Sequence, residues 1–520
     1  MSLEQFKSKD NLFALTIFII SLCAFMVWGY GYIPSNHLLL FVLASIFGIF
    51  MAFNIGGNDV ANSFGTSVGA KTLTIKQALI IAAVFELSGA VFAGGEVTGT
   101  IRNGIIDFPT GSSVVTPMAF MVVMMSALFS AGGWLFIATK FGMPVSTTHS
   151  IVGGIVGAGL TMGIIYTDSS QAMEMIKWSK VGEIVMSWFI SPLAGGILAY
   201  MIFGYVKTRI INPSIRLQTK VKIFKKQRKE FKENYINDLS KKPVSEQIKM
   251  LRKIAMSDEE DDAEHFGYKD KIKEMKLREK SIDTLVYMRT HIPIVAGCGA
   301  MIIAGSMLLK GLSHLNLGLT AIQNIWIVFI VGVGGYLVSY ALVNLIKKDN
   351  ALKGINRIFG WFQIFTASSF AFSHGANDIA NAVGPFAAIL DVLRTNAINE
   401  SSPVPFIAMM VFGVALVVGL WFLGKEVITT VGSKLTEIMP ATGFSAELAS
   451  SFVILVATQM GLPISSTHVL IGAVLGIGVF NKNAQWSMLK PIGLAWVITV
   501  PIAMVGSAAC FVVVKYLIGI

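Results

Sequence analysis

The sequence GGNDVAN at residues 56–62 returns as GANDIAN at residues 375–381, 319 positions later, and each copy lies in a long apolar stretch. A second motif repeats at the same spacing, as PVSTTH at residues 144–149 and PISSTH at residues 463–468. A charged residue costs roughly 2.5–3.5 kcal/mol at the centre of a membrane helix on insertion scales. Two polar motifs repeated at one spacing therefore indicate two related halves that build one site together, as in secondary transporters.

The composition predicts a membrane protein. Hydrophobic residues make up 54% of the 520 residues and charged residues only 14%, whereas a soluble domain carries about 25% charged residues. Several stretches reach the roughly 20 apolar residues that cross a bilayer. We expect an all-α polytopic protein with about 10–12 transmembrane segments, some of them broken or re-entrant half-helices.

A polar segment separates the two membrane halves. We expect a first half at residues 1–206, a charged insert at 207–290 and a second half at 291–520. Residues 207–226 contain seven basic residues and no acid, which marks the cytoplasmic side of a membrane and predicts an inner (plasma) membrane protein with a cytoplasmic insert. Binding of anionic lipid is the alternative use of these charges. Because most of the excess charge lies in this one segment, nucleic acid is not an expected partner.

The first motif type offers ligands to a cation. Paired glycines at residues 56–57 are expected to break the helix within the membrane and to leave main-chain carbonyls without partners. Hard oxygen ligands of this kind suit a desolvated Na⁺. The alternative is a polar contact between helices. The predicted sodium ligands are Asn58, Asp59, Ser63, Asn377 and Asp378.

The second motif type offers donors to an anion. Proline favours the first position of a helix, and serine and threonine favour its first turn, so a helix is expected to begin at each copy. A helix N-terminus provides free N–H groups and the positive end of the helix dipole. Capping without any ligand is the alternative, because it uses the same groups. The predicted phosphate-binding hydroxyls are Ser146, Thr147, Thr148, Ser465, Ser466 and Thr467.

The two kinds of site complement each other. The carboxylates of Asp59 and Asp378 would repel an anion, but a cation between carboxylate and anion turns the repulsion into attraction. Binding of the two ions would then be positively coupled, which is the basis of symport.

Four further ionisable residues form a candidate ion path: Glu86, His149, His374 and His468. The two histidines that end the second motifs have an alternative structural role, which is to bond the backbone at a helix start. Glu86 has the alternative of pairing with Arg102 or Lys71. His374 stands where the first copy has Ile55, so the site need not be symmetric.

Together these motifs resemble those of the inorganic phosphate transporter family, also called the Pho-4 or PiT family. Residues 57–69 match its first signature and residues 374–385 its second, and the segments 100–104, 144–149 and 463–468 also fit. The likeness covers both membrane halves and leaves out the insert.

The resemblance implies uptake of inorganic phosphate coupled to Na⁺ or H⁺, two halves of inverted orientation, and a homodimer in the bilayer. It places Asp59, Asn62, Asp378 and Asn381 at the substrate and cation site. Asn58 replaces the histidine of proton-coupled relatives, which favours Na⁺.

The expected function is therefore Na⁺/phosphate symport by alternating access. The alternatives left open are symport of phosphate or a metal–phosphate complex with H⁺, a permease for sulfate or another oxyanion, and an anion channel. We expect no enzyme activity and no cofactor besides Na⁺ as the coupling ion, because the sequence shows no nucleophile–base arrangement and no metal-ligand cluster of the usual spacing.

Overall fold

The structure is a computed structural model of the chain. It describes residues 9–107, 115–143, 145–256, 266–308, 318–346, 351–399, 404–434, 439–484, 486 and 489–519. Within these residues it is built from helices, with no strand beyond an isolated bridge between Ile106 and Ile176. Eleven of the described helical stretches are long and apolar enough to cross a membrane. The predicted all-α polytopic class is confirmed.

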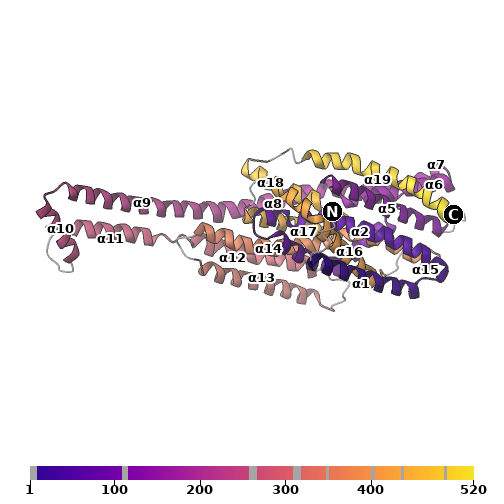
Figure 1. Cartoon of the computed structure of the whole chain (residues 1–520), viewed down its shortest axis with the longest axis horizontal. Helices are drawn as coiled ribbons and strands as arrows, with labels where there is room; N and C mark the ends of the chain where they lie inside the picture. Colours follow the sequence, from indigo (N-terminus) through magenta and orange to yellow (C-terminus); the bar gives the residue numbers. More distant parts are fainter. Residues whose placement is uncertain are drawn as a thin grey trace. The chain divides into compact units, whose positions relative to one another are not determined.

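The described part of the first half contains eight α-helices (Figure 1). They are α1 (Lys9–Tyr32), α2 (Leu38–Gly69), α3 (Ile75–Ala93), α4 (Gly95–Asn103), α5 (Pro117–Lys140), α6 (Thr147–Tyr166), α7 (Ser169–Glu174) and α8 (Trp178–Val206). A long helix, α9 (Asn212–Ser240), follows, and then come α10 (Val244–Met256) and α11 (Phe266–Ser281).

The second half supplies the remaining described helices. They are α12 (Val286–Ser306), α13 (Ala321–Asn344), α14 (Ala351–Asp378), α15 (Ala380–Thr395), α16 (Phe406–Lys434), α17 (Pro440–Gln459), α18 (Ser466–Asn481) and α19 (Leu489–Ile518).

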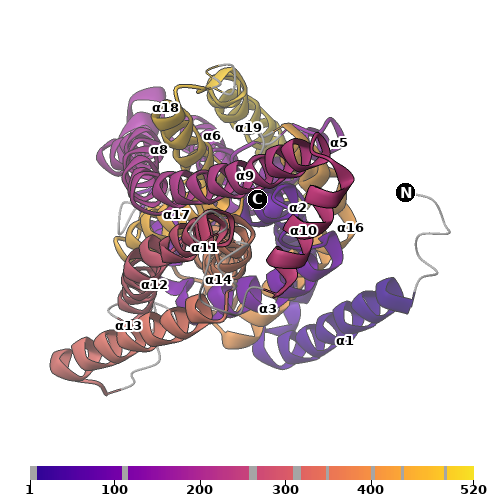
Figure 2. The same cartoon turned by 90° about the vertical axis from the view of Figure 1, so that its left-hand side faces the viewer.

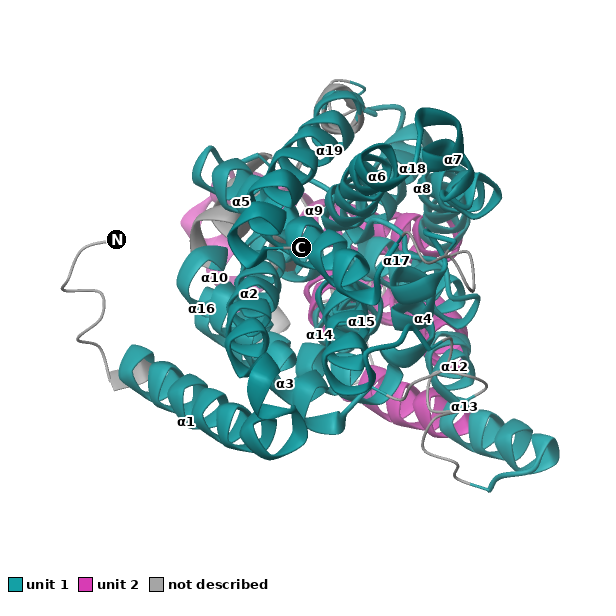
Figure 3. Ribbon diagram, turned by 90° about the vertical axis from the view of Figure 1, so that its right-hand side faces the viewer, with its two compact units in different colours: residues 1–204, 298–332, 359–520 teal, residues 205–297, 333–358 magenta. Residues whose placement is uncertain are grey.

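The chain divides into two compact units, coloured separately in Figure 3. Unit 1 comprises Met1–Gly204, Cys298–Gly332 and Phe359–Ile520, and unit 2 comprises Tyr205–Gly297 and Val333–Ile358. The predicted insert falls within unit 2, together with the adjoining parts of α12, α13 and α14. The division into halves at residues 206 and 291 stays a prediction.

Unit 2 contains the helical pair α9 and α11, which lie side by side (Figure 2). Tyr268 of α11 stacks on Tyr235 of α9, with ring centroids 4.1 Å apart. Arg228 of α9 forms an ion pair of 2.7 Å with Glu279 of α11. Stacked aromatic rings and an ion pair thus join these two otherwise polar helices.

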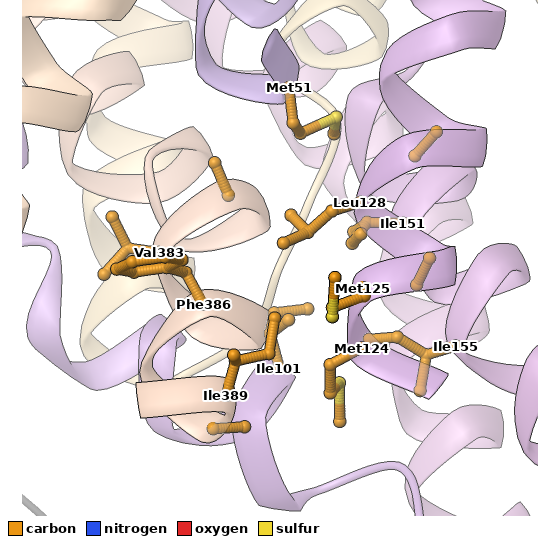
Figure 4. Close-up of a cluster of buried hydrophobic side chains, with 14 of the residues drawn as sticks. Met51, Ile101, Met124, Met125, Leu128, Ile151, Ile155, Val383, Phe386 and Ile389 are labelled. Carbon is orange, nitrogen blue, oxygen red and sulfur yellow. The ribbon is translucent and has the colours of Figure 1, made fainter. Parts of the chain in front are cut away.

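The core of unit 1 is a tightly interlocked set of apolar side chains. Figure 4 shows Met124 and Met125 of α5 facing Phe386 of α15, with Ile101 of α4 between them. Water is absent from a bilayer interior, so such contacts stabilise a membrane protein through van der Waals packing.

The structure corrects one expectation about the glycines. Gly56 and Gly57 do not break α2, which runs without interruption from Leu38 to Gly69. A Cβ at Gly56 would overlap the main-chain carbonyl of Leu416 in α16, so this glycine allows two helices to approach closely. The interruption occurs instead in the second copy, at Ile379 between α14 and α15.

Candidate functional site

Two aspartates, one from each half, meet in the interior of unit 1. Asp59 lies in α2 and Asp378 ends α14, and each is 1% exposed. Their carboxylate oxygens and a ring nitrogen of His374 all lie within 4.8 Å of one another. His374 precedes Asp378 by one helical turn, and its Nε2 is 2.9 Å from Asp378 Oδ2. The repeat in the sequence therefore corresponds to one shared site.

A third carboxylate joins this cluster from α3. Glu86 is fully buried, and its Oε1 lies 3.1 Å from Nδ1 of His374. Arg102, one of the partners considered for Glu86, instead forms an ion pair with Asp391. Three buried carboxylates thus surround one imidazole. Uncompensated charge is costly in a low-dielectric interior, so cations or protons must balance these acids.

Several oxygens of the cluster are available to a ligand. Asp378 Oδ1, Asn381 Oδ1 and Glu86 Oε2 are buried and accept no hydrogen bond from the residues that the structure describes. Buried polar atoms are nearly always paired, so orphaned oxygens beside carboxylates point to a bound cation. Oxygen donors of this kind fit Na⁺.

Hydroxyl groups of the second motif type surround the two aspartates. Ser466 Oγ donates to Asp378 Oδ2 over 3.0 Å, and Thr467 Oγ1 donates to Asp59 Oδ1 over 3.3 Å. The hydroxyls of Thr147 and Thr148 come from the first half and accept hydrogen bonds from Asn381 Nδ2, at 3.2 and 3.3 Å. Hydrogen bonds therefore link predicted cation residues to predicted phosphate residues, within and across the two halves.

Two helices begin at this network. Ser146 caps α6 and Ser465 caps α18, and each serine oxygen accepts the N–H of the histidine three residues later. Both helices begin directly after these serines, within the two copies of the motif, as the sequence predicted. Their first-turn N–H groups provide the positive helix ends that an anion needs.

Asn58 and Asn377 make equivalent contacts in the two halves. The Asn58 amide donates to Thr139 Oγ1 (2.8 Å) and Met143 O (3.2 Å) and accepts the N–H of Val145 (3.1 Å). The Asn377 amide makes the same three contacts at positions 319 residues later: Thr458, Leu462 and Ile464. Each amide holds the segment that leads into α6 or α18. Their role as sodium ligands stays a prediction.

The other predicted residues occupy distinct places. Ser63 is fully buried one turn after Asp59 in α2. The side chain of Asn62 lies outside the described part of the chain. His149 and His468 are buried with ring centroids 5.0 Å apart, and His149 also packs on Trp188. The structure thus brings together the two histidines that end the copies of the second motif.

One buried acid was missed by the sequence analysis. Glu447 of α17 is fully buried and accepts hydrogen bonds from Ser67 (2.7 Å), Thr366 (2.7 Å) and Thr66. It is the one charged residue in the apolar stretch 440–459, and this isolation could have identified it. The repeat gave no signal, because the position 319 residues earlier holds Leu128.

Comparison with known proteins decides the family. The model of the phosphate transporter family matches residues 55–507. The chain belongs to this family. Phosphate transporter family members move phosphate across membranes, so the chain is a membrane-spanning transporter and the enzyme alternative is set aside.

Individual members of the phosphate transporter family resemble the chain over nearly its whole length. "Putative phosphate permease Mb2302" from Mycobacterium bovis is 45% identical, covering 96% of this chain and 93% of its own. "Putative phosphate permease PF1020" from Pyrococcus furiosus is 33% identical, covering 95% of this chain and 100% of its own. A solved structure, "The sodium-dependent phosphate transporter", superposes with a TM-score of 0.71 at 29% identity, covering 92% of this chain and 99% of its own.

Proposed function

We propose that this chain imports inorganic phosphate by symport with Na⁺, by alternating access around the site that its two halves share. The observation that carries the proposal is the cluster of Asp59, His374 and Asp378, with ligand atoms within 4.8 Å and an orphaned Asp378 Oδ1. The solved relative named as sodium-dependent supports the choice of ion.

The electrostatics explain why the cation and phosphate bind together. Phosphate at the starts of α6 and α18 lies beside hydroxyls that already contact Asp59 and Asp378. A cation at the carboxylates cancels their repulsion of the anion, so each ion raises the affinity for the other. Movement of Na⁺ down its gradient then drives phosphate uptake, because the coupled ions bind together while the site faces outward and leave it together once it faces inward.

Coupling to H⁺ is the second candidate. It is favoured by His374, which bridges Glu86 and Asp378 at 3.1 and 2.9 Å and could carry a proton between two acids. In the Na⁺ mechanism the same imidazole balances one of the three carboxylates. The two mechanisms differ in the gradient that drives uptake.

Orientation and assembly belong to the same proposal. The seven basic residues and no acid at residues 207–226 support a cytoplasmic insert, and with it a plasma membrane location. Assembly as a homodimer rests on the resemblance of the motifs to those of the phosphate transporter family.

The deciding experiment is uptake of radiolabelled phosphate into proteoliposomes that contain the full chain. An inward Na⁺ gradient is compared with a pH gradient in Na⁺-free buffer, and unlabelled sulfate serves as competitor. We expect uptake with Na⁺ alone, its loss in both Asp59→Asn and Asp378→Asn, and no competition by sulfate. Asp238→Asn, which alters an exposed acid of unit 2, is the control that should transport normally.

Other outcomes would replace the proposal with a named alternative. Uptake driven by the pH gradient alone would assign H⁺ as the coupling ion. Competition by sulfate would widen the substrate to oxyanions. Flux that needs neither gradient and does not saturate with phosphate would indicate a channel.

A further inference from the structure

The two halves of unit 1 differ in the shape of one pair of helices. Asp59 and Asp378 make α2 equivalent to α14 and α15, and the Glu-Val dipeptides at residues 96–97 and 426–427 make α3 and α4 equivalent to α16. The packing supports this equivalence, because Gly56 lies against Leu416 and Gly375 against Glu86. Yet α2 and α16 are continuous, whereas their equivalents are interrupted at Ile379 and Gly94.

The two interruptions lie against each other. A Cβ at Gly94 would be 2.6 Å from Cγ2 of Ile379. Beyond this point α4 and α15 continue together, since a Cβ at Gly384 would lie 2.9 Å from Cβ of Ile101. Figure 3 shows α4 beside α15. The two interruptions thus separate one packed pair, α4 and α15, from the helices that precede them, α3 and α14.

A buried ion pair joins the far ends of α4 and α15. Arg102 Nη2 lies 2.9 Å from Asp391 Oδ2, with side-chain exposures of 5% and 4%. Asn399 supports both partners: its N–H and Nδ2 donate to Asp391 at 2.9 and 3.0 Å, and its carbonyl accepts from Arg102 (3.1 Å) and Asn103 (3.2 Å). Breaking a buried pair leaves uncompensated charges, so Arg102 and Asp391 keep each other in place while both stay buried.

The equivalent end of the molecule cannot form this pair. The position equivalent to Asp391 is Thr72, and the position equivalent to Arg102 is Gly432. A threonine and a glycine carry no charge. The ion pair thus occurs at one end of unit 1 only, and the repeat does not duplicate it.

The ion pair is connected to the transport site through α15. Asn381 lies at the start of this helix and binds Thr147 and Thr148, and Asp391 lies ten residues further on. Ten residues of helix span about 15 Å. A movement of α15 that separates it from α4 would therefore also displace Asn381.

We propose that Arg102 and Asp391 form a latch, supported by Asn103 and Asn399, that holds α4 on α15 in the state described and opens once in each transport cycle. Arg102 is a positioning residue for the site. The inference rests on the alternating access of the proposed function, in which the continuous and the interrupted helix pairs exchange roles between the two states.

Two details fit a contact that opens. When Arg102 leaves, Asp391 keeps both donors from Asn399, so its carboxylate is not stripped of partners. The latch also lies at a defined end of unit 1: Lys177 Nζ donates to Asn103 O over 3.2 Å, and α8 starts at the next residue and ends where the insert begins.

Chemical cross-linking tests the latch. Cys23, Cys298 and Cys510 are first replaced by alanine, and Arg102→Cys/Asp391→Cys is then treated with a cleavable bifunctional thiosulfonate in proteoliposomes. We expect phosphate uptake to fall to the level of protein-free liposomes and to return when a reductant cleaves the bridge. If the first pair folds poorly, Asn103→Cys/Asn399→Cys joins the same elements without removing either charge. We expect it to show the same loss of uptake on cross-linking and the same recovery on reduction.

A control pair separates locking from chemical damage. Lys180→Cys/Glu183→Cys places a bridge within one turn of α8, where Lys180 Nζ lies 2.7 Å from Glu183 Oε2, and does not join α4 to α15. It should transport normally after treatment. Normal uptake by a fully cross-linked Asn103/Asn399 pair would overturn the latch. Because uptake before cross-linking measures transport itself, this result leaves the proposed function intact.

Discussion

Thr467 donates a hydrogen bond to Asp59 across 3.3 Å, although the two residues come from different halves of the chain. The equivalent hydroxyl, that of Thr148, donates instead to the carbonyl of Ile464 at 3.0 Å, and Asp378 is bound by Ser466. The start of α18 is thus tied to both carboxylates. A change of charge at the aspartates is therefore transmitted directly to the segment proposed to hold phosphate.

Replacing Thr467 by valine removes this hydroxyl with little change of shape. A hydrogen bond to a charged group contributes about 1.5–3 kcal/mol, so we expect the Na⁺ concentration for half-maximal uptake to rise about tenfold or more. Thr467→Ser keeps the hydroxyl and should stay near the wild type. Thr148→Val, which loses a bond to a neutral carbonyl, should show a smaller effect. Equal Na⁺ dependence of the three variants would contradict a role for the Thr467–Asp59 contact.

The amides of Asn58 and Asn377 predict a pair of equivalent stability defects. Each alanine variant strands a buried main-chain N–H, that of Val145 or Ile464, and we expect each to cost about 1–3 kcal/mol. The measurement is the apparent Tm of the purified protein in detergent. Asn58→Asp keeps the acceptor for Val145 and should lie between alanine and wild type in Tm if the hydrogen bonds, and not the polarity alone, hold the segment.

Gly375 allows α14 to approach α3, since a Cβ there would overlap the main-chain carbonyl of Glu86. Gly375→Ala should therefore lower the apparent Tm, because overpacking typically costs about 1–3 kcal/mol, and should reduce uptake by displacing Glu86 from His374. Gly99→Ala in α4 is the matched control, because its Cβ would meet no atom within 4 Å. A Gly375→Ala protein as stable and active as Gly99→Ala would show that the two helices can separate without loss.

The sequence predicted the shared site because its two aspartates recur at one spacing, and a repeat in sequence becomes a symmetric position in space. It did not predict which glycines break a helix. Gly56 faces Leu416, a residue 360 positions away, and nothing local distinguishes a glycine that permits close packing from one that ends a helix. The interruption at Ile379 carries no glycine of its own and lies against Gly94 of the other half.

The role of the second-motif histidines was also beyond the sequence. Their main-chain N–H groups donate to Ser146 and Ser465, and the proximity of their rings depends on how α6 meets α18. Both the ion path and the structural role of the rings stay predictions. Asymmetric residues were the hardest to interpret. His374 could be recognised because a repeat partner, Ile55, stood in its place, whereas Glu447 lay outside both motifs.

Glu447 provides the last prediction. Its carboxylate accepts hydroxyl donors from α2 and α14, so it ties an element of the first half to two elements of the second. The equivalent position in the first half holds Leu128, which packs in an apolar cluster. Leucine is therefore a natural replacement to test at position 447. Glu447→Leu nevertheless should be destabilising, because it strands the buried hydroxyls of Thr66 and Ser67.

The expected cost for Glu447→Leu is about 1–3 kcal/mol for each hydroxyl left unpaired, seen as a lower apparent Tm and reduced uptake. Glu447→Gln keeps one carbonyl acceptor and should retain more stability than leucine. Adding Thr66→Val and Ser67→Ala to Glu447→Leu removes the stranded hydroxyls and should recover part of the lost Tm. Failure of the triple variant to regain any stability would show that the charge of Glu447, and not its hydrogen bonds, is what the fold requires.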